Sequence, residues 1–394
     1  MPSSQPVCRA LALSFVGLAA TSTALAAQYR TPSYKDLTIV RNRPWAKQDF
    51  LEFRAGALAS QPSGKDEARS AEDALGFDGH VYWRKTQAFG RQGHLDVYAG
   101  RDGAYVGLTE GDPTRQAGYS RLELFGRQWG HFVREGFYSS DDFIPVGQYR
   151  MRDWRARLSF ATQFAETLRG EVGGFYGKNT FSRYKRTATS YSIPENYSVY
   201  GVSAIIEDNK LQLDPSSSLP AQGFLLSAWI EREWNSSDKV FGITGRETEL
   251  PSAVVRGGGH LEWYFPYTNS GTWVLEADVG VAPKDDRVWI YDTSKPVGQI
   301  WVDGRVSYRI LLSDTLSLLP GARAQWVQIA DEFNMRREKE LFFGAQVELR
   351  ADFSENLAIA LEYSFLTNES REPVLFHDDS IGVHRLFLGI EFRP

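Results

Sequence analysis

Residues 299–310 read QIWVDGRVSYRI, and apolar and polar side chains alternate along this stretch. One face carries the apolar residues Ile300, Val302, Val306, Tyr308 and Ile310. The other face carries Trp301, Asp303, Arg305, Ser307 and Arg309. Successive side chains of a β-strand point to opposite sides, so this period of two predicts a strand with one apolar and one polar face.

The same alternation recurs in residues 273–281, 341–350 and 356–365, and it dominates from about residue 48 to the C-terminus. No segment shows a long helical period of 3.6 residues. The strands are about 10–13 residues long, whereas strands of soluble proteins usually have about 5–6 residues. A tilted strand needs about 9–11 residues to cross a bilayer, so the length predicts membrane-spanning strands.

The composition of the 394 residues agrees with this prediction and excludes other classes. Mean hydropathy is −0.37 and 24% of residues are charged, which argues against a bundle of membrane helices. Aromatic residues reach 13%, as expected for belts at the two membrane interfaces. The net charge of −5 makes nucleic acid an unexpected partner. Cys8 is the only cysteine, so we expect neither disulfides nor thiolate chemistry.

The N-terminus predicts export. Residues 9–26 read RALALSFVGLAATSTALA, a single positive charge followed by an apolar stretch and a small-residue cleavage site. We therefore expect residues 1–26 to be a cleaved signal peptide, with a membrane anchor as the alternative. Residues 27–47 show little alternation and predict a periplasmic leader, and residues 48–394 predict one barrel domain.

Short and long connections between the predicted strands mostly alternate. The short ones are expected at residues 90–93, 126–130, 163–166, 235–238, 267–271, 313–314 and 353–355. The long ones are expected at residues 59–74, 109–116, 139–147, 179–195, 248–252, 282–297, 328–338 and 367–382. Transmembrane barrels of bacteria have short periplasmic turns and long outer loops.

The number of strands stays open between two even values. We count 16 strands if residues 179–221 form one external loop, and 18 if residues 197–206 and 211–214 are both strands. The predicted fold class is therefore all-β, a transmembrane antiparallel β-barrel of 16–18 strands.

The last strand carries a resemblance to a known class of proteins. Residues 383–394 read VHRLFLGIEFRP, with apolar side chains at the alternating positions Leu386, Leu388, Ile390 and Phe392. This pattern resembles the C-terminal assembly signal of Gram-negative outer-membrane β-barrels, although two residues follow Phe392 here. The resemblance implies the outer membrane as location, contact with its lipid and lipopolysaccharide, and insertion by the barrel-assembly machinery.

The size of the barrel resembles general porins and the barrels that serve exopolysaccharide and capsule export. The second class would add periplasmic export proteins as partners. The resemblance therefore implies a channel for polar solutes or polymers, including polysaccharide. It names neither the solute nor the direction of transport.

The polar faces of the strands predict the lining of the lumen. They carry Arg121, Glu123, Arg155, Arg157, Arg169, Glu171, Trp229, Glu231, Glu233, Arg256, Glu262, Glu276, Asp278, Trp301, Asp303, Arg305, Arg309, Arg323, Glu348, Arg350, Glu362 and Arg385. Both signs are mixed, so the lining predicts a polar conduit with weak ion selectivity. The alternative is that these charges form cross-strand ion pairs that stiffen the wall.

Four aromatic residues also fall on polar faces, namely Trp229, Tyr264, Trp301 and Phe342. They favour either a carbohydrate track or ordinary packing in the interior. The run Gly257-Gly258-Gly259 lies inside a predicted strand and indicates a bend, a bulge or a close backbone approach.

Catalytic and metal-binding motifs are weak. His377-Asp378-Asp379-Ser380 and Asp141-Asp142 fall in predicted outer loops, but adjacent residues seldom form a catalytic triad and no G-x-S-x-G elbow occurs. The remaining histidines show no metal-ligand spacing, so we expect no metal and no cofactor. The main prediction is a channel without chemistry of its own. An outer-membrane enzyme using His377 and loop carboxylates, and a plugged structural or adhesive barrel, are the alternatives.

Overall fold

The fold is seen in a computed structural model of the chain. The structure describes residues 49–62, 75–88, 93–100, 103–111, 118–139, 142–183, 187–213, 220–237, 240–249, 252–281, 300–330, 337–354, 356–367 and 380–392. The predicted signal peptide and leader lie outside these residues and stay predictions. In the described part of the chain, no helix has the length and apolarity needed to cross a membrane.

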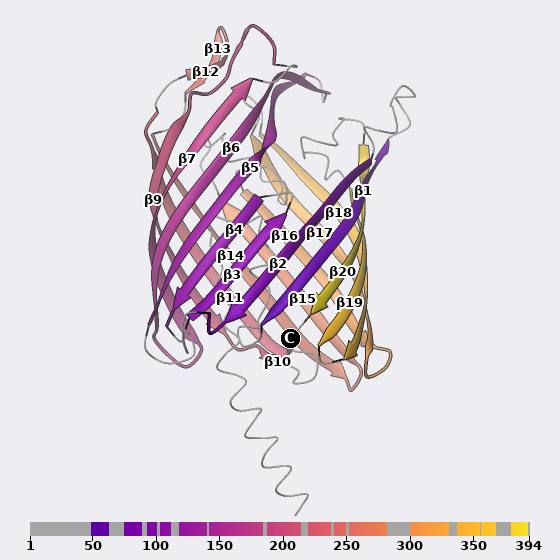
Figure 1. Cartoon of the computed structure of the whole chain (residues 1–394). Helices are drawn as coiled ribbons and strands as arrows, with labels where there is room; N and C mark the ends of the chain where they lie inside the picture. Colours follow the sequence, from indigo (N-terminus) through magenta and orange to yellow (C-terminus); the bar gives the residue numbers. More distant parts are fainter. Residues whose placement is uncertain are drawn as a thin grey trace, which may run out of the picture.

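Sixteen long antiparallel strands form one closed barrel (Figure 1). They are β1 (Phe50–Pro62), β2 (Leu75–Thr86), β3 (Gly93–Gly100), β4 (Gly103–Glu110), β5 (Tyr119–Ser139), β6 (Asp142–Gln163), β7 (Leu168–Arg183), β9 (Tyr197–Asn209), β11 (Pro220–Asn235), β14 (Ala253–Thr268), β15 (Gly271–Val281), β16 (Ile300–Leu311), β17 (Leu316–Ala330), β18 (Arg337–Ser354), β19 (Leu357–Thr367) and β20 (Ser380–Phe392). A seventeenth strand of the sheet, β10 (Gln212–Leu213), pairs only with the start of β11.

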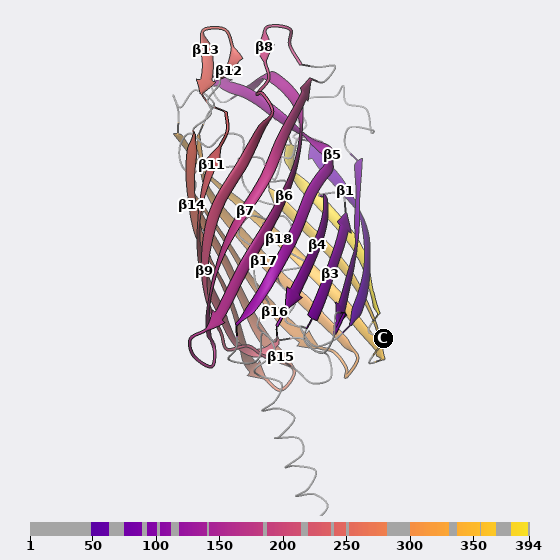
Figure 2. The same ribbon diagram turned by 60° about the vertical axis from the view of Figure 1, so that its left-hand side comes forward.

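The barrel closes where the first strand pairs with the last. β1 and β20 are antiparallel from Leu51 opposite Phe392 to Pro62 opposite Ser380. The start of β1 and the end of β20 therefore lie at the same end of the barrel, which we call the termini end; the other end is the distal end. At the distal end, β8 (Tyr191–Ser192), β12 (Val240–Ile243) and β13 (Arg246–Glu249) form a small separate sheet (Figure 2).

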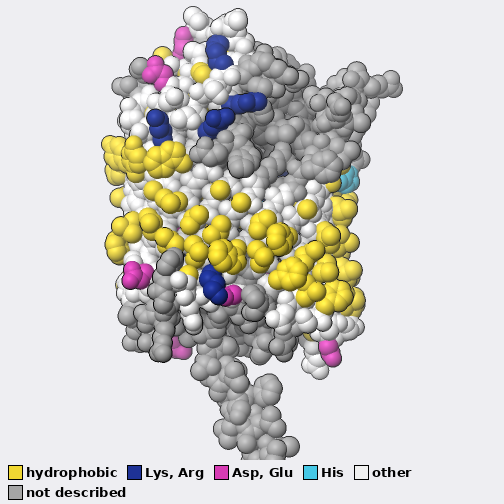
Figure 3. Space-filling model, in the orientation of Figure 1, with side chains coloured by type: hydrophobic (Ala, Val, Ile, Leu, Met, Phe, Trp, Pro, Cys, Tyr) yellow, Lys and Arg dark blue, Asp and Glu magenta, His cyan; other side chains and the backbone are white. Residues whose placement is uncertain are grey.

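The outward face of the barrel is apolar. Large hydrophobic side chains such as Phe160, Val172 and Ile230 are more than half exposed, which a protein surrounded by water alone seldom shows over so large an area. Figure 3 shows hydrophobic side chains as a band across the middle of the visible face, with charged side chains above and below it. The band is what contact with lipid hydrocarbon requires.

The inward face is polar, and it contains the most deeply buried side chains. Arg157 and Glu123 have no exposed surface, and burial alternates residue by residue along β7 and β9. The period-two pattern of the sequence therefore places apolar residues outside and charged residues inside, the reverse of a soluble protein. This confirms the predicted all-β, closed antiparallel barrel.

Several predicted connections are wrong. Residues 126–130 are no turn, because β5 continues through them with a register shift between Arg127 and His131. Gly126 and Gly130 were a signal of this irregularity inside a strand, since glycine there often marks a bulge. Residues 109–116 join β4 to β5 at the termini end, not at the distal end.

The sequence analysis missed one hairpin, and this hairpin contributes to the count of sixteen strands. β3 and β4 are joined by a turn between Gly100 and Gly103, and Gly103 has a φ of 143° that other residues rarely adopt. Residues 197–209 form the spanning strand β9, so residues 179–221 are not one loop. Of the predicted strand at residues 211–214, the structure describes only the short β10, which does not span. The predicted short turn at residues 235–238 is wrong, because β11 ends at Asn235 at the distal end. Relative to the predicted sixteen strands, the number of strands gained equals the number lost, so the barrel still has sixteen.

Candidate functional site: the inner wall of the barrel

The inner wall divides into two parts that differ in exposure. Inward side chains of β2 to β14 form the buried half-wall, in which most are nearly inaccessible. Inward side chains of β15 to β20 and of β1 form the accessible half-wall, in which many are partly exposed. Side-chain exposure is 34% for Arg305, 30% for Asp278 and 28% for Glu362, against 0% for Arg157.

The first part of the buried half-wall is a relay of hydrogen bonds from β2 to β5. Arg84 donates to both carboxylate oxygens of Asp96, at 2.6 and 3.0 Å. The Tyr105 hydroxyl accepts from Arg121 at 2.6 Å and donates to Glu123 at 2.8 Å. Each buried charge therefore has a partner of opposite sign, as charges removed from water require.

The second part of the buried half-wall contains pairs between adjacent strands and a pair that crosses two strands. Arg157 on β6 lies 3.7 Å from Glu123 on β5 and 3.4 Å from Glu171 on β7. Arg155, also on β6, donates to Glu233 on β11 at 3.0 Å and so passes over β7 and β9. Arg256 on β14 continues the chain of contacts, donating to Glu231 at 3.1 Å.

Small residues on β7 and β9 make room for these long side chains. A Cβ added to Gly177 would lie 2.8 Å from Cγ of Arg155. A Cβ added to Gly173 would lie 2.9 Å from Nε of Arg157. Glycine at these inward positions therefore leaves room for the side chains of Arg155 and Arg157.

The accessible half-wall combines pairs between adjacent strands with a few contacts that cross a strand. Arg323 on β17 binds Asp303 on β16 through Nε at 2.9 Å and Nη2 at 2.5 Å. Arg305 reaches Glu276 only at 3.9 Å, and Arg309 donates to the carbonyl of Pro220 at 2.8 Å. These groups leave part of their surface to solvent, so they can exchange partners with hydrated ions at modest cost.

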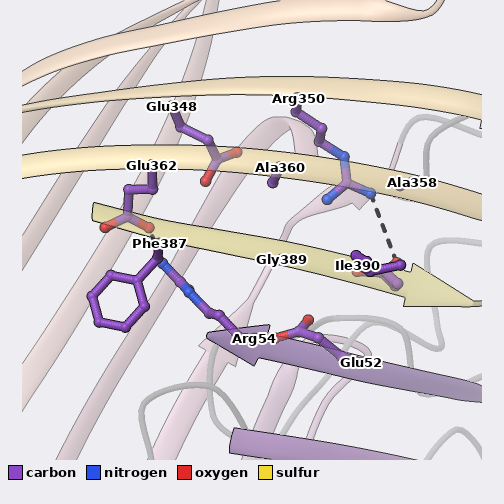
Figure 4. A pocket seen from close by; sticks show the side chains of 11 residues that line it. Glu52, Arg54, Glu348, Arg350, Ala358, Ala360, Glu362, Phe387, Gly389 and Ile390 are labelled. Atoms are coloured by element: carbon purple, nitrogen blue, oxygen red, sulfur yellow. Dashed lines mark hydrogen bonds and ion pairs between the residues drawn. The ribbon is translucent and has the colours of Figure 1, made fainter. Parts of the chain in front are cut away.

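A charged pocket lies on the accessible half-wall where the barrel closes, and we call it the seam pocket (Figure 4). It contains about 430 Å³ of empty space, including open solvent. It is lined by Glu52, Arg54, Glu348, Arg350, Ala358, Ala360, Glu362, Phe387, Gly389, Ile390 and Glu391. Arg54 of β1 forms an ion pair with Glu362 of β19 and so bridges β20 from inside.

A histidine lies between two acids at the junction of the half-walls. Nε2 of His260 is 2.8 Å from Glu262 and its Nδ1 is 3.0 Å from Asp278. No group of three histidine, cysteine or acidic residues able to hold a metal ion occurs among the described residues. His377, Asp378 and Asp379 lie outside the described residues, so the enzyme alternative stays a hypothesis.

The structure places the predicted lining residues on the inner face of the wall. Trp301 is the exception, because its side chain lies outside the described part of the structure. Trp229 packs over Gly258, where an added Cβ would lie 2.8 Å from the indole, so the glycine run marks a close backbone approach. Tyr264 belongs to an apolar cluster with Leu225 and Val274. These two rings therefore have packing contacts, and a carbohydrate track along them stays a prediction.

Sequence reasoning missed several inward groups, namely Glu52, Arg54, Arg84, Asp96, Glu207 and Glu391. The signal was present, because each lies on the polar face of a period-two stretch. What no local pattern shows is which inward charges are buried, since Arg155 and Glu233 are 78 positions apart in sequence.

Comparisons with known proteins give the fold class. No protein-family model matches the chain. No curated protein matches it in sequence. The structure of BamA from Haemophilus ducreyi lacking POTRA domains 1–3 matches with a TM-score of 0.50 at 11% identity, over 88% of this chain and 71% of that chain.

CdiB from Acinetobacter baumannii matches with a TM-score of 0.52 at 10% identity, over 88% of this chain. This chain spans 60% of CdiB. At such identities the likeness shows the fold alone: a closed antiparallel barrel of the kind found in outer-membrane proteins.

Proposed function

We propose that this outer-membrane-type barrel is a channel for small polar solutes, with the accessible half-wall as its conducting surface. The observation that supports the proposal is the partial exposure of charged inward side chains on β15 to β20 and β1. Charged side chains are kept at a partly exposed interior surface only where water reaches them. The Gram-negative outer membrane, reached through a cleaved signal peptide, is the location that we propose with it.

The size of the solute follows from the buried half-wall. A barrel of about 16 strands is wide enough for an aqueous channel. Here the guanidinium and tyrosine side chains of the buried half-wall occupy one side of that space, so the passage is narrower than the backbone suggests. The packed positions of Trp229 and Tyr264 give no support for a polymer track. We therefore propose ions and small hydrated molecules as the solutes.

The direct test is single-channel recording of the purified, folded barrel in a planar bilayer. The wild-type protein should conduct with weak ion preference because both charge signs line the accessible half-wall. Arg305→Glu combined with Arg309→Glu should shift the reversal potential toward cation preference. Arg152→Glu combined with Lys178→Glu makes the same change of charge on outward-facing, exposed residues and should leave ion preference unchanged.

Two results would contradict the channel. One is repeated insertion of folded barrels without conductance, which would favour the plugged structural barrel. The other is conductance that is indifferent to Arg305 and Arg309, which would place the path elsewhere.

A further inference from the structure

The seam pocket carries an excess of negative charge. Its lining contains four carboxylates, those of Glu52, Glu348, Glu362 and Glu391, and two guanidinium groups, those of Arg54 and Arg350. All of these side chains come from β1, β18, β19 and β20, near the termini end of the barrel. A concave site with one dominant sign concentrates counter-ions of the other sign.

Three of the four carboxylates are already partnered. Glu52 lies 3.0 Å from Nε2 of His80, Glu362 pairs with Arg54, and Glu391 lies 3.7 Å from Arg350. Glu348 is different: within the described residues it makes no hydrogen bond or close ion pair, and the guanidinium groups of Arg350, Arg54 and Arg309 attract it only from a longer distance. Figure 4 shows its carboxylate between Glu362 and Arg350.

Glu348 also faces another carboxylate across the sheet. It lies directly opposite Glu362 in the register of β18 and β19. Like charges at directly opposed positions of a sheet are destabilising. A cation bound to Glu348 would relieve this repulsion.

Small residues leave space for a ligand beside Glu348. Ala358, Ala360 and Gly389 form part of the pocket lining. A Cβ added to Gly389 would meet only Ala360, at 3.9 Å from its carbonyl oxygen and 4.0 Å from its Cβ. The pocket therefore accepts a group larger than a single water without displacing backbone.

The chemistry of the lining selects among cations. No three metal-ligating side chains converge in the described residues, which argues against a dedicated divalent-metal site. The guanidinium of Arg54 lies 5.0 Å from the ring centre of Phe387, so that ring already has a cation and offers no cage for a quaternary ammonium. A primary ammonium is compact and has three donors, which suits a carboxylate that has no close ion pair.

We infer that the seam pocket is a binding subsite for a primary ammonium group, with Glu348 as the residue that holds it. The inference deepens the proposed function, on which it rests, by naming amine-bearing solutes among those that the accessible half-wall receives. Such a subsite lies at the termini end, so an amine would be captured or released at that mouth.

The test is isothermal titration calorimetry of n-butylammonium chloride into the folded barrel in detergent at low ionic strength. Wild type should bind saturably, and Glu348→Gln should weaken binding by about tenfold or more, as expected for a lost charge-assisted hydrogen bond. Glu276→Gln is the matched control, since it removes another inward carboxylate of the accessible half-wall and should leave binding unchanged. The uncharged analogue n-butanol should not bind.

Three outcomes would overturn the inference: no saturable binding of n-butylammonium, equal loss in Glu348→Gln and Glu276→Gln, or magnesium binding through Glu348 more tightly than the amine. These outcomes are separable from failure of the channel. Calorimetry does not require conduction, so binding that depends on Glu348 in a barrel that never conducts would uphold the subsite and reject the proposed function. Conduction without such binding would do the opposite.

Discussion

The buried and accessible half-walls have the same sequence pattern but different packing. In the buried half-wall, Arg155 and Arg157 reach across or along small residues to acids on other strands. In the accessible half-wall, Arg305 and Arg323 pair with the adjacent strand and keep some exposure. Glycines such as Gly177 lie beneath the buried guanidinium groups.

This contrast shows that a polar inner face is not by itself a conduit. Where long cationic side chains can cross small neighbours, they meet distant acids and make a polar core. In the accessible half-wall, Arg54 also crosses a strand to reach Glu362, but these two side chains stay 25% and 28% exposed. One barrel thus combines a polar core with a solvent-reaching surface, and stability should depend on the first more than on the second.

The largest expected effect comes from removing the strand that closes the accessible half-wall. Deleting residues 383–394 takes away most of the partners of β1 and β19, from Phe392 to Val383. No closed, heat-modifiable barrel should form, because the ion pairs of the buried half-wall cannot replace a lost hydrogen-bond ladder. Gel mobility before and after heating measures this.

Deleting only Arg393 and Pro394 is the control and should be tolerated, and Phe392→Ala should lower the yield in part. Normal yield without residues 383–394 would show that the buried half-wall holds the barrel alone.

A large effect is expected from Arg157→Ala. Removing this guanidinium takes one cationic partner from the buried carboxylates of Glu123 and Glu171. Such a loss typically lowers the free energy of unfolding by about 3–5 kcal/mol. Arg305→Ala, its counterpart in the accessible half-wall, should cost less than about 1 kcal/mol because the pair is long and partly exposed. Urea unfolding in detergent compares the two. Equal losses would remove the distinction between the half-walls.

A moderate effect is expected from filling glycines. A Cβ at Gly201 would lie 2.3 Å from the Phe175 ring and 2.4 Å from the Arg232 carbonyl, so Gly201→Ala should cost about 1–3 kcal/mol. Gly389→Ala in the seam pocket meets only ordinary contacts and should change stability by less than about 0.5 kcal/mol. The same unfolding assay measures both, and a Gly389 variant as unstable as the Gly201 variant would contradict the packing described.

The smallest effect concerns an exposed pair at the termini end, where Asp49 accepts hydrogen bonds from Lys85 and Thr86. Burial raises the pKa of the Asp49 carboxyl, but these hydrogen bonds outweigh burial and hold its pKa below the usual value of 3.8. A carboxyl with a lowered folded-state pKa stabilises above its unfolded pKa and loses that contribution as the pH falls through the folded value.

Asp49→Asn should therefore cost less than about 1 kcal/mol at pH 7 and flatten the pH dependence of stability only below about pH 4. Unfolding midpoints at pH 7 and pH 3 measure this. A difference between variant and wild type that grows as the pH falls would have the wrong sign.

The fold could be predicted from the sequence to a large extent because its main signal is local. Alternation in residues 299–310 places Asp303 and Arg305 inside, and the structure has them there. The turns were harder, since Gly126 in a continuous strand and Gly100 at a hairpin look alike in sequence. Glycine permits both a bulge and a turn, and only pairing with neighbours decides between them.

The division of the inner wall could not be predicted, because it arises from contacts between distant segments. Arg155 and Arg305 both lie on the polar face of a strand. Arg155 reaches Glu233 across two strands, whereas Arg305 reaches only Glu276 on the adjacent strand. The seam pocket needs Arg54 and Glu362, which are 308 positions apart. Barrel closure brings them together, and no window of sequence contains both.

Thiol accessibility tests the division of the inner wall most directly. Cys8 is the only cysteine of the chain and lies in the predicted signal peptide, so single Ser→Cys variants report on one site each. Ser159 and Ser203 of the buried half-wall are 0% and 5% exposed, whereas Ser317 and Ser364 of the accessible half-wall are partly exposed. In the folded barrel, a water-soluble, positively charged thiol reagent should label Ser317→Cys and Ser364→Cys, and leave Ser159→Cys and Ser203→Cys unlabelled until unfolding. Equal labelling of all four variants, or labelling of Ser159→Cys and Ser203→Cys alone, would contradict the division into a buried and an accessible half-wall.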